Sequence, residues 1–301
     1  MQSQGSDAPP GSPLRLVRPG DSMRPAFPCQ RGMLVSVEGV TGVGKSYLTT
    51  QLREQSADLA SGAVMIEEFS RRPARGELGH DLLNALITAA RGDPFLRGGR
   101  PAAETLLLLA IKTYDYEAHC APAMRHGHLV LEGRSLHGIA VYQSLILNPG
   151  DDEQTYDEMR AILEIAAQWR PMPDLTFLVT DDVSAAIVRA ERRDGTTFTS
   201  EERLLHHRVD ALFDRLAKDA PDVVIVIDRR HLSNEDAIAL MQARASERQR
   251  TLPCINQAGR LGSLDPLPCA NGCRLVEEPS GKAQPTMAAE TSTREDVTGQ
   301  P

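Results

Sequence analysis

Cysteine pairs of the kind that bind zinc or form a disulfide framework are missing from the sequence. The 301 residues include only five cysteines, and no two of them make a Cys-x-x-Cys pair. Closely paired cysteines are typical of zinc sites and of small disulfide-rich domains, so we expect neither here. Cys269 and Cys273 are close enough in sequence to share a metal, but unpaired thiols in a C-terminal tail are the simpler interpretation. The five positions are Cys29, Cys120, Cys254, Cys269 and Cys273.

Long apolar runs and an excess of positive charge are missing as well. No stretch of 18 apolar residues occurs, and the N-terminus has no apolar signal-peptide core. The 33 lysines and arginines are outnumbered by 41 aspartates and glutamates, which gives a formal charge of −8. This balance gives no general attraction to nucleic acid or to an anionic membrane, so phosphate must be bound by local clusters of Arg and Lys. We therefore expect a soluble, cytoplasmic protein with no nucleic-acid or membrane partner.

Composition divides the chain into three parts. Residues 1–31 are rich in Pro, Gly and Ser, and beyond Arg250 the chain is rich in Pro, Gly, Ser, Thr and Glu. Such segments cannot bury enough apolar surface to offset the entropy lost on ordering. The sequence thus predicts a disordered arm over 1–31, a folded domain over 32–249 and a disordered tail over 250–301.

Within the domain, apolar strand patterns alternate with helical patterns. The predicted strands are Met33–Glu38, Ala63–Phe69, Leu129–Arg134, Asp174–Thr180 and Val223–Ile227. Helical patterns cover about 44–60, 77–90, 101–126, 136–147, 151–169 and 233–247. Two further helices are expected: one carries Ala186, Ile187 and Ala190, and one carries the apolar stripe from Leu205 to Leu216, which follows a capping-box pair of Thr199 and Glu202. This order predicts an α/β fold, a five-stranded parallel sheet with helices on both faces. Ligands are then expected at the carboxyl ends of the strands.

The most specific motif follows the first predicted strand. Residues 39–46, Gly-Val-Thr-Gly-Val-Gly-Lys-Ser, fit the pattern G-x-x-x-x-G-K-[ST] between a strand and a helix. In this motif the backbone N–H groups face phosphate oxygens, and the helix N-terminus adds its positive dipole end. Lys45 can reach the β- and γ-phosphates, and the Ser46 hydroxyl can hold Mg²⁺. The expected ATP-binding residues are those of the motif, Gly39, Val40, Thr41, Gly42, Val43, Gly44, Lys45 and Ser46. Arg189, which lies on a later basic helix, is expected to bind ATP as well.

Arginines outside this motif indicate a second anionic ligand. Arg71 and Arg134 each follow a predicted strand, so both should overlook the binding edge of the sheet. Together with Lys45 they carry more positive charge than one nucleotide triphosphate needs, and Arg binds phosphate bidentately. Further along, the trio Arg189, Arg192 and Arg193 shares one helix face and precedes Gly195. A basic helix end beside a mobile glycine suits a closing lid, and a solvated charged face is the alternative.

Five fragments in order resemble the thymidylate kinases, from about Gly32 to Arg244. Val37-Glu38-Gly39 resembles the family's F-E-G start, and Ser70-Arg71-Arg72-Pro73 with Leu78-Gly79 resembles its T-R-E-P…L-G stretch. Residues 104–110 resemble its A-E-L-L-L-F-A helix, and residues 189–193 its lid. Arg134, Tyr142 and Gln143 fall at the spacing of its D-R-Y-x-x-S-x-x-A-Y-Q motif.

The resemblance implies a phosphate-loop kinase fold with a lid, and transfer of the γ-phosphate of ATP to a nucleoside monophosphate. Arg71 and Arg134 would hold the acceptor's monophosphate, Tyr142 would pack beside the sugar, and Gln143 would orient the base. Arg192 or Arg193 would supply the catalytic cation with Lys45 and Arg134. A homodimer is compatible with the resemblance.

Four positions depart from the family pattern. Thr41 and Gly133 stand where the family has Asp, Leu108 where it has the aromatic that stacks on thymine, and Lys112 where it has an Arg that contacts the base. Glu132 is the acid nearest to the missing Asp, and we assign it with Ser46 to Mg²⁺. The phosphate contacts are therefore kept, whereas the sugar and base contacts are altered. The resemblance implies dTMP or a related pyrimidine monophosphate as acceptor, and the altered contacts predict that the acceptor is not tightly restricted to thymine.

Two other functions stay open at this point. A deoxynucleoside kinase would need a base near the 5′-hydroxyl, for which Glu67, Glu68 and Glu132 are the candidates, but Arg71 argues against it. A nucleotide-binding regulatory protein without turnover would explain the two missing aspartates, but Lys45, Ser46 and the lid arginines oppose it.

Overall fold

A single parallel sheet organises the fold. The computed structural model describes residues 31–56, 62–66 and 77–252, and in these ranges the strand order is β2-β3-β1-β4-β5. All neighbouring strands run parallel, which confirms the predicted five-stranded sheet. The strands are β1 (Met33–Glu38), β2 (Ala63–Ile66), β3 (Leu129–Gly133), β4 (Leu175–Thr180) and β5 (Val224–Asp228).

The strands are apolar along their length because both faces of the sheet are covered. All six residues of β1 are buried, and at its centre Val35 is in register with Leu131 of β3 and with Leu175 of β4. Parallel sheets flanked by helices on both sides need such continuous apolar strands. The core of the domain therefore lies along β1, β3 and β4.

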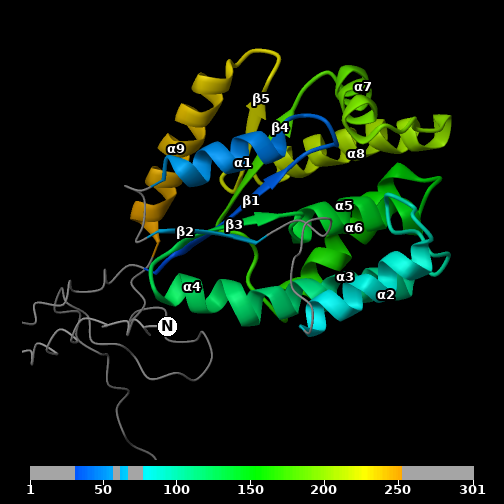
Figure 1. Ribbon diagram of the computed structural model, residues 1–301, viewed down its shortest axis with the longest axis horizontal. Coiled ribbons are helices and arrows are strands. Elements are labelled where there is room, and N and C mark those ends of the chain that lie inside the picture. Colours follow the sequence, from blue (N-terminus) through cyan, green and yellow to red (C-terminus); the bar gives the residue numbers. More distant parts are fainter. Residues whose placement is uncertain (1–30, 57–61, 67–76, 253–301) are drawn as a thin grey trace, which may run out of the picture.

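Helices form a layer on each side of this sheet (Figure 1). On one side α1 contacts α9, and on the other α5 contacts α3, α6 and α8, while α2 packs on α3 and α7 on α8. The bounds are α1 (Lys45–Glu54), α2 (Leu78–Ala90), α3 (Pro101–Asp115), α4 (Ala121–Arg125), α5 (Leu136–Leu147), α6 (Asp152–Ala167), α7 (Val183–Asp194), α8 (Ser200–Asp219) and α9 (Asn234–Thr251). The layers leave the carboxyl ends of the strands facing the loops that carry the expected site.

The long helix expected over 101–126 has a change of geometry near its end. A π-helical segment, η2 (Tyr116–Cys120), connects α3 to α4 without a break in helical backbone. Pro122 has no N–H to donate, so the regular hydrogen-bond ladder is interrupted at this point. The sequence pattern therefore located the helical stretch correctly but did not reveal its π-helical segment.

The edges of the domain differ slightly from the predicted boundaries. Arg31, assigned to the arm, donates from Nη1 to Asp174 Oδ2 at 3.0 Å, and its carbonyl accepts a 2.9 Å hydrogen bond from Gln249 Nε2. Helix α9 continues to Thr251, and Leu252 after it is buried. Arg31 and residues 250–252 therefore belong to the folded domain. The rest of the arm and tail lies outside the described residues, so their disorder stays a prediction.

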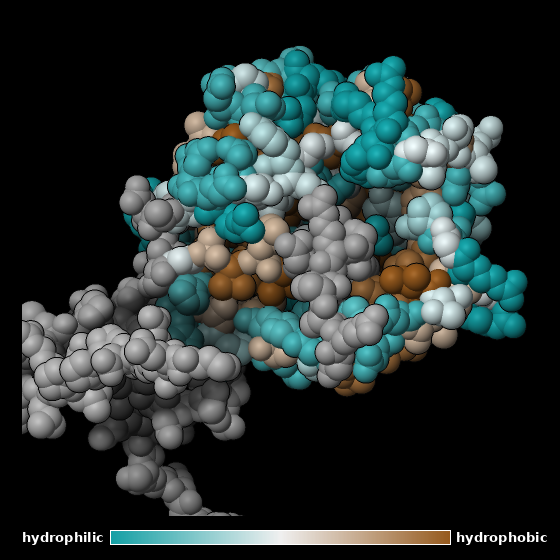
Figure 2. All heavy atoms as spheres, viewed as in Figure 1, coloured by the Kyte–Doolittle hydropathy of each residue, from teal (hydrophilic) through white to brown (hydrophobic). Residues whose placement is uncertain are grey.

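The surface is unevenly polar. Figure 2 shows polar residues over most of the upper half of the face in view and apolar residues gathered mainly in the lower half. Among the described residues, no helix combines the length and the apolar character needed to cross a membrane.

Candidate active site

The phosphate-binding loop connects β1 to α1 and is pressed against neighbouring backbone. Gly39 has φ +135°, and a Cβ there would lie 2.2 Å from the carbonyl oxygen of Val179. Gly42 has φ +78°, and a Cβ there would lie 1.9 Å from the carbonyl oxygen of Ala186. Only glycine combines this conformation with such close approach. The end of β4 and helix α7 thus hold the loop in the shape in which its N–H groups can bind phosphate.

Lys45 and Ser46 occupy the positions that the motif requires. The Lys45 ammonium donates to the carbonyl oxygens of Gly39 and Val40, both at 2.8 Å, so it lies over the loop. Ser46 is exposed at the start of α1, while the Val40 side chain is buried in the core. The loop therefore presents a cation and a hydroxyl to solvent and anchors itself by an apolar side chain.

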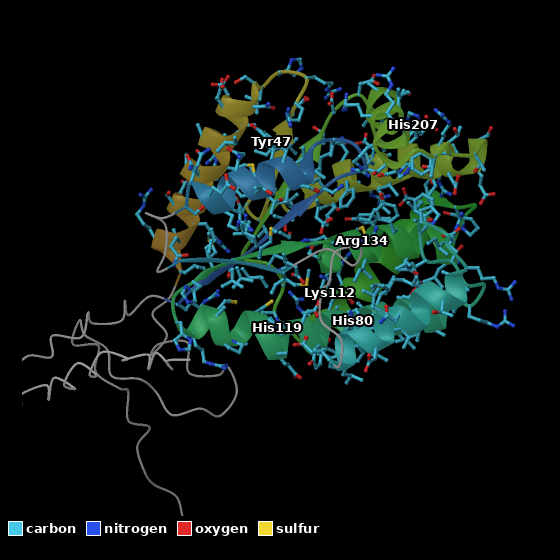
Figure 3. All side chains as sticks on the ribbon, in the orientation of Figure 1. Tyr47, His80, Lys112, His119, Arg134 and His207 are labelled. Atoms are coloured by element: carbon cyan, nitrogen blue, oxygen red, sulfur yellow. The ribbon has the colours of Figure 1, made fainter. Side chains whose placement is uncertain are left out.

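A cleft of about 460 Å³ opens beside this loop. Besides the loop, its lining includes Arg134 after β3, Tyr142 of α5, and Arg189 and Arg193 of α7. Figure 3 shows Arg134 near the centre of the molecule, beyond the end of β3. One cavity therefore gathers the donor site and several of the arginines that the sequence assigned to phosphate.

Arg134 has an unusual backbone conformation. Its φ is +50°, in the left-handed region that residues other than glycine rarely adopt. The next residue, Ser135, is held on both sides: its N–H donates to Glu38 Oε1 at 2.6 Å, and its hydroxyl accepts from the N–H of His137 at 3.2 Å. Strained backbone persists where the surroundings over-determine it, often at functional sites. Here the residue with the unusual conformation connects β3 to α5 and lines the cleft.

Glu38 is a carboxylate in the cleft that the sequence treated only as part of the F-E-G resemblance. It is 3% exposed, and burial raises its pKa against the opposing effects of Ser135 and Lys45. A Cβ at Gly138 would lie 2.6 Å from Glu38 Oε2, so α5 passes closely over it. Its place as the last residue of β1, at the carboxyl edge of the sheet, was the signal for a site residue.

The lid arginines differ in their placement. Arg189 donates from Nε to the Gly42 carbonyl at 3.0 Å and pairs with Asp181 at 2.5 Å, so it is tied to the phosphate-binding loop. Arg193 lines the cleft and pairs bidentately with Asp194, both contacts at 2.7 Å. Arg192 is exposed and is not among the residues that line the cleft. The geometry therefore favours Arg193 over Arg192 as the lid cation.

Lys112 and Glu132 belong to a buried ionic cluster beneath the cleft, and this contradicts their predicted roles. Both side chains are fully buried, Lys112 Nζ is 3.2 Å from Glu132 Oε1, and Arg170 binds Glu132 bidentately at 2.9 Å. Burial alone would raise the pKa of Glu132, but Arg170 and Lys112 lower it to about 2. With both oxygens occupied, Glu132 is not placed to hold Mg²⁺. Lys112 instead donates to the Gly133 carbonyl at 3.1 Å, directly before Arg134.

The other predicted base contacts are also buried away from the cleft. Leu108 is a core residue at 2% exposure, and Gln143 accepts a hydrogen bond from Thr105 Oγ1 at 2.9 Å at the same exposure. Neither is among the residues that line the cleft. Tyr142 does line it, and its contact with the sugar stays a prediction. Arg71 lies outside the described residues.

Comparison with known proteins settles the family. A family profile described as thymidylate kinase matches residues 37–237, more than half of the chain. The chain belongs to the thymidylate kinase family. It is therefore a nucleoside monophosphate kinase, as the sequence predicted.

Individual relatives agree with this assignment. The thymidylate kinase of Clavibacter michiganensis is 32% identical over 213 residues, covering 69% of this chain and 92% of the relative. A probable thymidylate kinase of Methanosarcina barkeri is 29% identical over 202 residues, covering 66% of this chain and 88% of that one. A thymidylate kinase structure from Ehrlichia chaffeensis matches at 19% identity with a TM-score of 0.49, over 70% of this chain and 99% of that chain, and the assignment does not rest on it.

Three aromatic side chains of this kinase's cleft were missed by sequence reasoning. They are Phe95, in the loop between α2 and α3, Phe198, in the loop before α8, and His206, within α8. Phe95 follows a Gly-Asp-Pro turn and Phe198 precedes the Thr199–Glu202 capping box. Both lay in segments that the sequence pattern identified only as connections, and His206 had no motif around it.

The cleft offers oxygen ligands for Mg²⁺. Among the described residues, no group of three or more His, Cys, Asp or Glu side chains could hold a metal by itself. Mg²⁺ commonly binds through one or two protein groups together with substrate phosphates and water. The Ser46 hydroxyl and the Glu38 carboxylate line the cleft and are candidates for that mode, whereas Glu132 is not among the residues that line it.

Proposed function

We propose that this kinase transfers the γ-phosphate of ATP to dTMP, with Mg²⁺ bound to the ATP phosphates. The observation that carries the proposal is one cleft that joins the phosphate-binding loop, Arg134 and Arg193. A site that bound only ATP would not need Arg134 at the end of β3 in addition to Lys45 and Arg193. Related pyrimidine monophosphates are accepted as well, because the family's base contacts are replaced.

Each residue has a place in the transfer. The loop amides and Lys45 hold the β- and γ-phosphates, and Ser46 and Glu38 would hold Mg²⁺. Arg134 holds the acceptor's phosphate, with Arg71 expected to assist. Tyr142 packs beside the sugar. Mg²⁺, when bound, neutralises charge on the β- and γ-phosphate oxygens.

The chemical step needs no covalent intermediate on the protein. An oxygen of the acceptor's phosphate attacks the γ-phosphorus, and the bond from that phosphorus to the bridging oxygen of ADP breaks. The protein aligns the two phosphates and neutralises the charge that spreads over the transferred group. Arg193, from the lid, meets that group and helps to exclude water.

The two alternative functions are not favoured. A nucleoside kinase would need a base, and Glu132, the described candidate, is occupied by Arg170 and Lys112. Glu67 and Glu68 lie outside the described residues. A binding protein without turnover has no support from the family assignment. The homodimer and the cytoplasmic location stay predictions, which a molar-mass measurement and cell fractionation would test.

The proposal is tested by ADP release with dTMP as acceptor, with Lys45→Ala as the matched inactive variant. The Lys45 side chain is half-buried and lies over the phosphate-binding loop rather than in the core, so its loss should abolish turnover without unfolding the protein. Turnover by the full chain, lost in Lys45→Ala while its circular dichroism is unchanged, is the expected result. Equal turnover in the variant would show that the donor site is assigned wrongly.

A further inference from the structure

Four aromatic rings cluster in the lining of the cleft. Phe95, Tyr142, Phe198 and His206 come from four separate segments of the chain and all line the cavity. Ring centroids of His206 lie 5.3 Å from Phe95 and 5.0 Å from Phe198, and Phe95 lies 6.0 Å from Tyr142. Such an aromatic wall suits the flat, uncharged part of a ligand rather than its phosphate.

His206 is the polar exception in this wall. It is only 2% exposed, yet neither Nδ1 nor Nε2 has a hydrogen-bond partner among the described residues. Buried polar groups in folded proteins are nearly always hydrogen-bonded, so an unpartnered imidazole needs an explanation. His137, another buried histidine of the same domain, shows the usual case, because its Nδ1 lies 3.0 Å from Thr176 Oγ1.

The charge state of His206 narrows the class of ligand. Burial and then the nearby Lys45 lower its pKa to about 4, so the ring is neutral at pH 7. A neutral imidazole offers one donor and one acceptor nitrogen, which match hydroxyl, carbonyl or ring-nitrogen groups. Lys45, Arg134 and Arg193 line the same cleft and supply the positive charge that phosphates need, so His206 is not required for them.

The base contacts implied by the family resemblance are not available here. Leu108, Lys112 and Gln143 are buried outside the lining of the cleft. The kinase thus has an aromatic pocket and one unpartnered imidazole where a nucleoside could be bound, but none of those expected groups.

We propose that His206 recognises the uncharged nucleoside part of the acceptor by hydrogen bonding, while Phe95 and Phe198 provide the apolar walls around it. The inference rests on the proposed function, since it names a specificity-determining residue for the same acceptor. His206 is a positioning group and takes no part in the transfer itself. The unsatisfied ring is the stability cost of a binding site that is completed by the ligand.

Two substitutions and one control test this assignment in the full chain. His206→Phe keeps an aromatic ring, somewhat larger than imidazole, and removes both nitrogens. His206→Asn keeps donor and acceptor groups, an NH₂ and a carbonyl oxygen, in a smaller side chain. His207→Phe is the control, because His207 is the next residue on α8 and is exposed (Figure 3). Kinetics with dTMP and ATP, calorimetric binding of dTMP, and thermal unfolding are measured for all three and for the wild type.

We expect His206→Phe to raise the KM and Kd for dTMP about tenfold, a typical effect of removing a hydrogen bond to a ligand. Its KM for ATP should change less than twofold, and its Tm should stay equal or rise, because an unsatisfied polar group has been replaced by an apolar ring. His206→Asn should recover part of the affinity, and His207→Phe should behave as wild type.

A merely structural role would give a different pattern. His206→Phe with a lower Tm, or with equal losses for ATP and dTMP, or with unchanged dTMP affinity, would overturn the proposal. If the wild type turns over no nucleoside monophosphate, the proposed function fails separately. The inference is then judged on the binding isotherms alone and is overturned if dTMP does not bind or if His206→Phe binds it equally.

Discussion

At the residue scale, Arg192 and Arg193 are neighbours in sequence with different surroundings. Both side chains are exposed, but Arg193 lines the cleft and pairs with Asp194, whereas Arg192 is not among the residues that line the cleft. Sequence spacing put both on one helix face with Arg189 and could not separate them, because a helix face is wider than the stripe that reaches the site. The two residues therefore form a matched pair for mutagenesis.

We expect Arg193→Ala to lower kcat by about 10³-fold with little change in the KM for dTMP, since a lid cation acts mainly in the transition state. Arg192→Ala should lower kcat less than threefold. Steady-state kinetics of both variants check this. A reversed order of the two effects, or a pure KM effect in Arg193→Ala, would place the lid cation differently from the structure.

At the element scale, a cluster of buried charged side chains packs at the end of β3. Lys112, Asp115, Glu132 and Arg170 are all at most 2% exposed, and Lys112 holds the carbonyl that precedes Arg134. Removing one partner of a buried ion pair leaves the remaining buried charge uncompensated, which lowers the free energy of unfolding by about 3–5 kcal/mol. The cluster thus links the stability of β3 to the position of the acceptor's arginine.

We expect Glu132→Gln to lower the free energy of unfolding at pH 7 by about that amount. The pKa of Glu132 in the folded state, about 2, is below its ordinary value of 4.5. Its contribution is therefore fully present above pH 4.5 and is lost as the pH falls toward 2. Urea unfolding from pH 7 to pH 2 should show the difference between wild type and variant shrinking below pH 4.5.

The control for this measurement is Glu153→Gln. Glu153 is 80% exposed and pairs with Arg215 at 2.9 Å, and exposed pairs contribute about 0–1 kcal/mol. A loss in Glu132→Gln no larger than in Glu153→Gln would show that the buried cluster does not stabilise the domain.

At the scale of the whole molecule, the sequence predicted the architecture better than the binding surface. Strand and helix patterns, the phosphate-binding loop and the Thr199–Glu202 capping box depend on neighbours in sequence. The structure confirms them, except that α1 ends at Glu54 and not near residue 60. The burial of Lys112 and Glu132 in one ionic cluster involves Arg170, which lies 38 positions beyond Glu132. No local sequence pattern connects Arg170 to the other two residues. Phe95, Phe198 and His206 meet only through tertiary packing, so the aromatic cluster in the cleft was not predictable.

The limits of the domain lead to a further expectation. A fragment of residues 31–252 should unfold within about 2 °C of the full chain, whereas 32–249 loses the Arg31–Asp174 contact and the buried Leu252. A lost contact energy of 1 kcal/mol lowers the Tm by about 2–4 °C in a domain of this size, so 32–249 should unfold several degrees lower. Thermal scans of the three proteins check this, and equal values for the two fragments would show that Arg31 and Leu252 do not stabilise the domain.

The central claim is that the second anionic ligand of the cleft is the phosphate of a nucleoside monophosphate. Arg134 has a strained backbone conformation at the end of β3 and lines the same cleft as the phosphate-binding loop, and a nucleoside would give it no anionic group to bind. The most direct test compares turnover of dTMP with turnover of thymidine by the full chain at the same concentration of ATP and Mg²⁺. The account predicts turnover of dTMP at least 100-fold faster. Thymidine as the better substrate would contradict it.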